Sequence, residues 1–331
     1  MHPLRFQPLL RRYLWGGTRL GADLRKPVGD DPQAAESWEL VDLEGDQSVV
    51  SHGKLAGTTL GEIVRHHPAA LFGRHHRDTP GGIPRFPLLL KFLDTAAPLS
   101  VQVHPNDAQG SLLSPPSLGK TEAWVILAAE AGSKIYAGLK RGFDRDALAR
   151  EVARGTCELC LHSFEPRAGD CVYLPAGAVH ALGAGILLAE IQQTSDITYR
   201  LYDWNRVGPD GKSRALHIEE SLAVIDFERG PVHPQSPVEV VIEPPVTGVR
   251  RERLATSEKF VIDRWQLNAP ARIGGDDRFH ILAVLEGAVD VEGDETTEPL
   301  HRGQSILIPA SLGAIEVFPR PSAVLLDSFQ P

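Results

Sequence analysis

The sequence predicts a mainly β protein with antiparallel strands arranged as sandwiches or barrels, together with a few short helices. Three observations lead to this fold class. Short strand-like runs follow one another with glycine and proline between them, and they do not alternate with helices. Only three segments have clear helical spacing of apolar residues. A glycine-and-proline turn motif also occurs twice, which is typical of a duplicated β unit.

Each expected element has a local reason. Helices are expected at 58–73, where threonine supplies an N-cap, at 144–155, where Gly155 ends the amphipathic pattern, and at 216–228. Strands are expected wherever β-branched or aromatic residues cluster between turn residues. Those runs are 35–42, 87–94, 99–104, 122–128, 134–139, 170–175, 185–193, 259–267, 280–293, 304–310 and 322–329.

A proline-rich stretch at 228–246 follows the third expected helix and predicts a linker. The expected domains are therefore residues 1–230 and residues 231–331. With 331 residues, a chain of this length can bury a large core in two such units.

The turn motif occurs once in each of the two expected units, so the two copies can be compared. Gly169 begins the pattern G-x5-P-x-G-x2-H, which ends at His180. Gly303 begins a second copy, G-x5-P, but Ser311 and Ala314 stand where the first copy has glycine and histidine. The second copy has kept the turn and lost the imidazole, so we expect two related β-barrels of which only the first carries a site.

Composition excludes several classes of partner. Hydrophobic residues make up 42% of the chain and charged residues 23%, which are ordinary globular values. A net charge of -9 argues against nucleic acid and anionic membranes, because both require a concentrated positive field. No apolar run approaches the roughly 18 residues of a membrane span, and arginines interrupt the N-terminal segment. We expect a cytoplasmic protein.

Three cysteines do not form a disulfide framework. Cys157 and Cys160 make a lone CxxC, but zinc binding would need a second such pair and redox chemistry a strand-to-helix context. We expect two strand residues there, one of them facing inward.

The strand at 99–104 is half apolar and half polar. Alternation places Ser100, Gln102 and His104 on one face, so the strand either has one solvated face or forms the wall of a site. His180 in the turn motif and Glu122 at the start of another strand would complete a set of metal ligands. Each residue alone is more often an ordinary polar side chain, whereas the joint pattern fits neighbouring positions of one small barrel.

Zinc suits an amide oxygen, two imidazoles and one carboxylate, because it accepts N and O ligands and leaves positions open in catalytic sites. With Glu122 as the only anionic ligand, a divalent ion keeps about one net positive charge. That charge preserves its Lewis acidity toward a substrate oxygen.

The G-x5-P-x-G-x2-H turn resembles the second cupin motif, and Gln102, His104 and Glu122 resemble the first cupin motif with one histidine replaced. More narrowly, the chain is similar to the short bacterial form of type I mannose-6-phosphate isomerases. The segments that carry this likeness, from about Tyr13 to Phe227, are "YLWGGTRL", "AESWEL", "PLLLKFLDTAAPLSVQVHPND", "GKTEAW", "LPAGAVHAL", "AEIQQTSDITYRLYDWNR" and "LHIEESLAVIDF".

This resemblance implies two cupin-like jelly-roll barrels and one Zn²⁺ per chain, and it assigns a set of site residues. Leu182 departs from the pattern, because some family members carry tyrosine there. The implied metal ligands are Gln102, His104, Glu122 and His180, the implied catalytic arginine is Arg200, and the implied pocket positions are Lys91, Ser100, Lys120, Glu190 and Asp196.

The implied reaction is the interconversion of mannose 6-phosphate and fructose 6-phosphate through a cis-enediol intermediate. Arg200 would stabilise the developing oxyanion. We favour Glu190 as the base, with Glu36 and Asp196 as alternatives that could instead form salt bridges. Lys91, Lys120 and Ser100 are candidates for contacting the phosphate, unless the lysines are only solubilising charges.

Three other functions stay open at this point. The chain could isomerise a different aldose, bind a sugar phosphate without catalysis, or act as an iron-dependent cupin oxygenase, because one fold hosts several chemistries. The expected partner is a small sugar phosphate. The expected assembly is a monomer or a small homo-oligomer, and the sequence does not choose between them.

Overall fold

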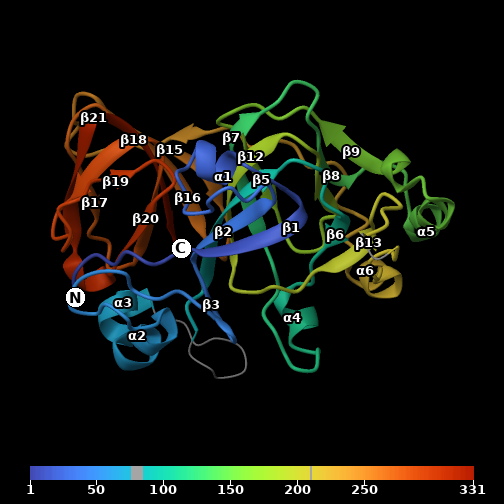
Figure 1. Ribbon diagram of the computed structural model, residues 1–331, viewed down its shortest axis with the longest axis horizontal. Coiled ribbons are helices and arrows are strands. Elements are labelled where there is room, and N and C mark those ends of the chain that lie inside the picture. The colour runs from blue at the N-terminus through green and yellow to red at the C-terminus, as the bar shows by residue number, and fades with distance from the viewer. Residues whose placement is uncertain (76–84, 209–210) are drawn as a thin grey trace.

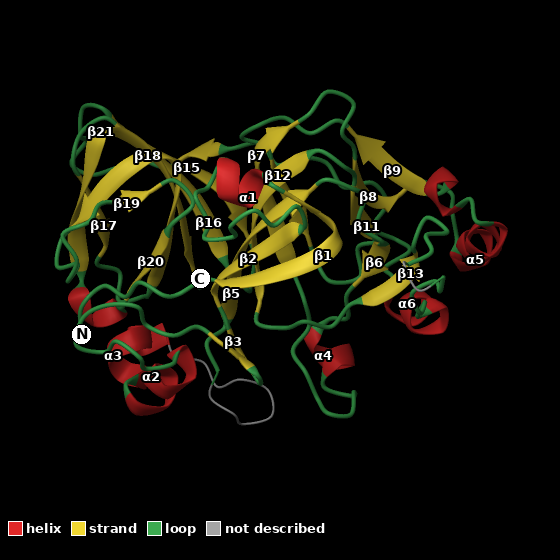
Figure 2. Cartoon of the chain, in the orientation of Figure 1, coloured by secondary structure: helices red, strands yellow, loops and turns green. Residues whose placement is uncertain are grey.

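Three antiparallel sheets form the body of the protein in the computed structural model, which describes residues 1–75, 85–208 and 211–331 (Figure 1; Figure 2). We name them the central, outer and C-terminal sheets. In order across the sheet, the central sheet contains β1 (Leu9–Gly17), β2 (Ala34–Leu40), β5 (Leu88–Thr95), β12 (Ile186–Gln193), β7 (Glu122–Ala129) and β10 (Cys171–Leu174). The outer sheet contains β13 (Tyr199–Tyr202), β6 (Val101–Val103), β11 (His180–Leu182), β8 (Ile135–Leu139) and β9 (Leu161–Phe164).

The C-terminal sheet lies on the opposite side of the molecule from the outer sheet (Figure 1). Its main path is β14 (Val238–Glu239), β15 (Val249–Thr256), β16 (Val261–Leu267), β21 (Ala314–Phe329), β18 (His280–Val291) and β19 (Leu300–His301), with β17 (Ala271–Gly274) on β21 and β20 (Ser305–Ile308) on β18. A short pair, β3 (Asp42–Leu43) and β4 (Asp46–Gln47), stands apart. A mainly β fold is therefore confirmed, but strand pairing closes none of these sheets into a barrel within the described ranges.

Helices are short and lie around the sheets (Figure 2). They are α1 (Arg19–Ala22), α2 (Leu60–His66), α3 (Pro68–Phe72), α4 (Asp107–Gly110), α5 (Arg145–Arg154) and α6 (Ile218–Val224), with 3-10 turns η1 (Gly73–His75), η2 (Cys157–Leu159) and η3 (Ala310–Leu312). None of the described helices is long and apolar enough to cross a membrane.

The helix expected over 144–155 is confirmed as α5, which Asp144 caps and Gly155 ends with φ of +72°. The single helix expected over 58–73 is wrong. Thr59 forms a capping box with Glu62 at the start of α2, but the chain breaks at His67 because Pro68 cannot continue the hydrogen-bond ladder. Pro68 instead opens the separate helix α3.

Two strand predictions also need correction. Cys157 and Cys160 are buried free thiols, but Cys157 begins the 3-10 turn η2, so the expectation that both lie on a strand is wrong. The expected strand at 99–104 is regular only over Val101–Val103. Its polar alternation is nevertheless retained, since Ser100 and Gln102 both line a cavity and His104 lies beside it.

The central sheet is buried on both faces, which explains its apolar strands. One face packs against the outer sheet through a core that includes Trp124, Leu188 and Ile135. The other face packs against the C-terminal sheet, where Phe92 shares a core with Ile281. A strand covered on both sides has no solvated face, so a polar side chain on it must find a partner inside the protein. The charged residues of β5, β7 and β12 are therefore informative.

Candidate metal centre and active site

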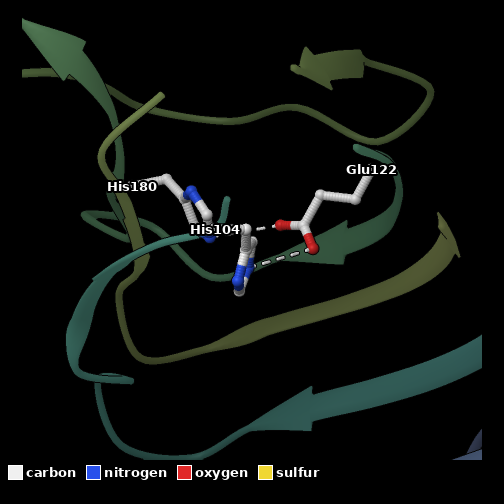
Figure 3. A group of neighbouring side chains, drawn as sticks. All are labelled: His104, Glu122 and His180. Carbon is white, nitrogen blue, oxygen red and sulfur yellow. Dashed lines mark ion pairs between the residues drawn. The ribbon is translucent and has the colours of Figure 1, made fainter. Parts of the chain in front are cut away.

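Three potential metal ligands converge between the central and outer sheets (Figure 3). Glu122 is the first residue of β7 in the central sheet, and His180 is the first residue of β11 in the outer sheet. His104 directly follows β6. The ligand atoms of the three residues lie within 4.8 Å of one another, and all three residues are buried. Glu122 Oε1 lies 3.2 Å from His180 Nε2, and Glu122 Oε2 lies 3.5 Å from His104 Nε2.

Backbone carbonyls orient both imidazoles. The Nδ1 of His104 lies 2.7 Å from the carbonyl of Ile197, and the Nδ1 of His180 lies 2.8 Å from the carbonyl of Ala178. Each ring donates its Nδ1 proton to that carbonyl, which leaves the lone pair of Nε2 directed toward Glu122. The Nε2 of His180 has no hydrogen-bond partner, whereas the Nε2 of His104 accepts a hydrogen bond from Lys120 Nζ at 3.3 Å. Burial lowers the pKa of His104 to about 3 and also lowers the pKa of His180, so both rings are neutral ligands.

The donor set fits a divalent metal ion. His180 Nε2 and Glu122 Oε1 are enclosed by protein and have no hydrogen-bond partner, an arrangement that costs free energy unless a cation satisfies both atoms. Burial opposes the charge on Glu122, but the ammonium group of Lys120 holds the pKa of its carboxyl well below the usual range. The ligands would therefore meet the ion as one carboxylate and two neutral nitrogens, which suits Zn²⁺.

Gln102 lies on the same face as this group. On β6 it stands opposite His180 of β11 on one side and opposite Arg200 of β13 on the other. Directly opposed residues of antiparallel strands project to the same side of the sheet. Gln102 thus lies between His180 and Arg200 on the same face of the outer sheet.

A cavity of about 320 Å³ opens next to the ligand group. It brings together Gln102 and every substrate-binding or catalytic residue predicted from the sequence, which are Lys91, Ser100, Lys120, Glu190, Asp196 and Arg200. The cavity is also lined by residues that our reasoning did not assign to it, which are Tyr13, Trp15, Leu93, Leu99, Thr198 and Arg214, and by Glu36, which we held only as an alternative base.

Alternating charges line the floor of this cavity. Lys120 contacts Glu122 and lies 3.6 Å from Glu190, while Lys91 lies 3.7 Å from Glu190 and 3.5 Å from Glu36. Burial alone would lower the pKa of Lys91, but Glu36 and Glu190 raise it, and Glu122 in the same way raises the pKa of Lys120. Both lysines therefore stay charged inside the protein.

Glu190 has the environment of a general base. Burial raises the pKa of its carboxyl above the ordinary value. The indole Nε1 of Trp124 donates to Glu190 Oε2 at 3.0 Å, whereas Glu190 Oε1 is enclosed without a hydrogen-bond partner. One oxygen is thus held by the indole, whereas Oε1 accepts no hydrogen bond and lies 3.6 Å from Lys120 Nζ and 3.7 Å from Lys91 Nζ.

Arginines gather at another part of the cavity. Arg200 donates from Nη1 to the carbonyl of Ala215 at 3.0 Å. Arg214, which also lines the cavity, makes two hydrogen bonds to Asp203 at 2.8 and 2.5 Å, and Arg206 shares the same carboxylate. Two guanidinium groups thus share one carboxylate, and Arg200 adds a further positive charge to the wall of the cavity, so positive charge is in excess there. The segment "KSRALH" that supplies Arg214 has no periodicity that would have indicated this role.

The departure at Leu182 has a structural explanation. Leu182 is buried in the core between the central and outer sheets, in the same cluster as Trp15. Tyr13 stacks on Trp15 with ring centroids 5.4 Å apart, is 41% exposed, and lines the cavity. An aromatic surface is therefore supplied by β1 rather than by β11.

The three-layered β fold and the buried His–Glu–His group define a cupin-type protein with a possible metal site. Comparison with known proteins agrees with this class. The family model described as phosphomannose isomerase type I, catalytic domain, matches residues 4–134, and the model described as mannose-6-phosphate isomerase, cupin domain, matches residues 251–320.

Relatives extend the match over nearly the whole chain. Mannose-6-phosphate isomerase ManA of Bacillus subtilis is 35% identical over 95% of both chains, and mannose-6-phosphate isomerase of Streptococcus mutans is 32% identical over 94% of this chain and 93% of that one. A crystal structure of the mannose 6-phosphate isomerase from Bacillus subtilis superimposes with a TM-score of 0.88 at 28% identity, covering 99% of both chains. The chain belongs to the type I phosphomannose isomerase family.

Proposed function

We propose that this protein interconverts mannose 6-phosphate and fructose 6-phosphate, with one Zn²⁺ per chain held by Gln102, His104, Glu122 and His180. The observation that supports the metal site most directly is the pair of enclosed, partnerless atoms, His180 Nε2 and Glu122 Oε1, beside the substrate-sized cavity. The names of the relatives support the substrate. When bound, the ion would supply Lewis acidity toward the oxygens on C1 and C2 of the opened sugar.

Glu190 performs the proton transfer in this proposal. Its Oε1 removes the proton from C2 of the open-chain aldose, and the electron pair moves toward O1 to give a cis-enediolate. The carboxyl group then returns the proton to C1, while the hydroxyl proton of O2 passes to O1, so that the carbonyl of the ketose forms at C2. Trp124 holds Oε2, so the same carboxyl group keeps one orientation through both transfers. Glu36 and Asp196, which also line the cavity, remain the alternatives for this role.

Arg200 stabilises the negative charge that develops on oxygen during the transfer, because a guanidinium stays protonated throughout. Ser100, Asp196, Lys91 and Lys120 bind the substrate. Both lysines are already paired with carboxylates, so we assign them to the sugar oxygens. The phosphate is then placed at the arginine-rich part of the cavity, where Arg214 and Arg200 face it.

For the chain as a whole, we propose a catalytic unit over residues 1–230 and a second cupin-like barrel over 231–331 that has no metal ligands. Ser311 and Ala314 at the positions of the glycine and histidine support the second assignment. We also propose a cytoplasmic enzyme that is a monomer or a small homo-oligomer. Three buried, unpaired cysteines support a reducing compartment.

The test is an isomerase assay on purified protein that has been stripped of metal and reconstituted with Zn²⁺. We expect fructose 6-phosphate to form from mannose 6-phosphate. When the reaction is run in D₂O, deuterium from the solvent should appear at C1 of the product. Binding of mannose 6-phosphate without turnover or exchange would instead identify a sugar-phosphate-binding protein. Turnover only of other aldoses in a substrate panel would identify a different isomerase.

A further inference from the structure

A second cavity of about 320 Å³ lies where the N-terminal part of the chain meets the turn between β19 and β20. We call it the seam cavity. Its walls come from residues 5–8, 24–27, 39, 51–52, 300–302 and 304–305. It shares none of these residues with the catalytic cavity.

Cationic side chains dominate the walls of the seam cavity. Arg5, Arg25, Lys26 and Arg302 face a single acidic lining residue, Glu39. Arg5 is paired with Asp294 at 2.6 Å and Lys26 with Glu39 at 2.6 Å. Arg25 and Arg302 form no ion pair with any residue in 1–75, 85–208 or 211–331, and the Nε of Arg302 is enclosed by protein without a hydrogen-bond partner. Arg302 also lines a neighbouring cavity together with Arg264 and Glu286. Arg25 and Arg302 are thus the two arginines of the seam cavity whose charge is not paired with a carboxylate of the described residues.

Arg25 adopts a backbone conformation that usually selects glycine. Its φ is +55°, and the turn that ends α1 is closed by hydrogen bonds from Arg25 N to the carbonyl of Gly21 and from Lys26 N to the carbonyl of Leu20. A glycine normally occupies this position of such a helix ending, and another residue costs about 1 kcal/mol there. An arginine that keeps this strained position at the wall of a cavity indicates a function for its side chain.

The second copy of the turn motif builds the opposite wall. Gly303 has φ of +84°, and its carbonyl accepts a hydrogen bond from Lys26 Nζ. A Cβ added at Gly303 would lie 2.7 Å from the Cβ of Leu24, so the two walls are in direct contact. The motif copy that lacks a histidine thus has a structural role, because it fixes Arg302 beside Lys26.

We propose that the seam cavity binds a small phosphorylated metabolite, with the phosphate on Arg25 and Arg302. Guanidinium groups match phosphate oxygens in geometry and charge, and Lys26 and Arg5 add a positive background field. Phe6, Pro8 and Leu300 provide apolar wall for the carbon part of the ligand. The volume exceeds that of free phosphate, which is why we assign a phosphate ester.

Strand β2 connects this site with the catalytic cavity. Glu39 lies at the seam cavity, where it pairs with Lys26 and accepts a hydrogen bond from Ser37 Oγ at 2.6 Å. Glu36, which belongs to the alternate set of residues on β2, lines the catalytic cavity and lies 3.5 Å from Lys91. Because Glu36 and Glu39 belong to the same short strand, we expect a ligand that shifts Lys26 and Glu39 to move Glu36 as well. We therefore expect occupancy to change turnover, a step that rests on the proposed function.

The binding test uses calorimetric titration with glycerol 3-phosphate, inorganic phosphate and glycerol. The wild type is compared with the double variant Arg25→Gln/Arg302→Gln and with the control Arg272→Gln, which changes an exposed arginine of the same half of the chain. We expect the double variant to lose one bound equivalent of glycerol 3-phosphate, or to bind it at least about tenfold more weakly at that site. The control should match the wild type, and glycerol should not bind.

Equal stoichiometry and affinity in the double variant and the wild type would overturn the proposal, whatever the isomerase assay shows. Stronger binding of inorganic phosphate than of the ester at the same site would reject the phosphate ester and assign free phosphate. In the kinetic arm, glycerol 3-phosphate should change kcat in the wild type, but not in the double variant, whose kcat and KM without ligand should stay within about twofold. An unchanged kcat in wild type with the site filled would overturn the coupling through β2.

Discussion

Trp124 contacts Glu190 and His180 with opposite parts of one indole. Its Nε1 donates to Glu190 Oε2 at 3.0 Å, and its ring meets the imidazole of His180 edge to face with centroids 5.4 Å apart. A single buried side chain thus supports both the proposed base and a proposed metal ligand. Mutation of Trp124 therefore tests how the position of Glu190 and His180 affects activity while both of these residues are still present.

Replacing Trp124 with phenylalanine removes the N–H donor and keeps most of the packing. The carboxylate of Glu190 loses a partner that favours its charged form, so its pKa should rise. We expect kcat to fall about tenfold and the acidic limb of the kcat/KM profile to move to higher pH, at unchanged zinc content. The control is Trp265→Phe, which removes a similar hydrogen bond to Asp327 far from the site. An unmoved acidic limb would contradict the assignment of Glu190 as the base.

Metal binding should depend on Gln102 and His180 but not on Arg200. We expect Gln102→Ala and His180→Ala to lose stoichiometric zinc by elemental analysis, because each removes a ligand atom. Arg200→Ala should keep zinc and lose turnover, since it removes only the group that faces the developing charge. His162→Ala serves as the control histidine outside the ligand group. Full zinc content in the His180 variant would refute the ligand assignment.

Removing the ion should also lower stability, because a ligand that binds only the folded state stabilises it by mass action. A chelator should reduce the melting temperature of the wild type, and added Zn²⁺ should restore it. The melting temperature of His180→Ala should be insensitive to both treatments. If the chelator removes the zinc but leaves the melting temperature of the wild type unchanged, the result would contradict a buried metal centre.

Two glycines of the second motif copy provide a matched pair. Gly303 and Gly313 both have positive φ, at +84° and +66°, but a Cβ at Gly303 would meet Leu24 whereas one at Gly313 would meet nothing within 4 Å. We expect Gly313→Ala to cost about 1–3 kcal/mol of unfolding free energy from backbone strain alone, because its φ of +66° and ψ of −149° lie in a region that is essentially restricted to glycine. Gly303→Ala should cost more than Gly313→Ala, because Leu24 must also move. If urea unfolding shows that both variants lose the same free energy of unfolding, the contact with Leu24 does not contribute to stability.

The C-terminal sheet holds a titrating histidine. His280 Nδ1 lies 2.8 Å from Asp327 Oδ1, and its Nε2 lies 3.0 Å from Asp276 Oδ1. Burial disfavours the charge, but the two carboxylates raise the pKa of His280 to about 9 from an ordinary value of 6.5. A raised folded-state pKa gives stability that is complete below pH 6.5 and is lost as the pH rises through about 9. A shift of this size corresponds to about 3 kcal/mol.

We therefore expect the melting temperature to fall between pH 6.5 and 9 in the wild type. Asp276→Asn removes one of the two carboxylates and should make this fall smaller. The carboxyl group of Asp276 has a lowered pKa, so its own contribution disappears only on acidification below its ordinary value near 3.8. A flat profile in the wild type over the alkaline range would show that His280 is neutral in the folded protein.

Local sequence signals predicted most of the elements, and the structure brings the candidate ligands together. The polar alternation around Gln102, the position of Glu122 at a strand start and the turn before His180 are local patterns, and cross-strand pairing brings these residues together. Most expected strands in the central sheet match β2, β5, β7, β10 and β12 in position. The identity of the metal and the site roles stay predictions.

The order of strands in the sheets could not be predicted from the sequence. Strands such as β5 and β12 are hydrogen-bonded neighbours in the central sheet although they are far apart along the chain. For the same reason Arg214 and Tyr13 were missed, since nothing in their own segments indicates which cavity they line. Pro68 indicates a break in the helix, but the apolar spacing that predicts a single helix continues on both sides of it. The cavity at Arg25 depends on contacts between distant parts of the chain.

Leu4 and Leu307 exchange both backbone hydrogen bonds, at 2.8 and 2.9 Å, so the first segment of the chain is paired with β20 near its end. During synthesis the N-terminal segment leaves the ribosome long before its partner strand exists. Leu4 therefore stays without its partner while about three hundred residues are added, whereas Phe6 can pair with Val50 much earlier. The docking of Leu4 is a final step of folding, and a nascent chain stalled before β20 would expose Leu4 to chaperones or proteases.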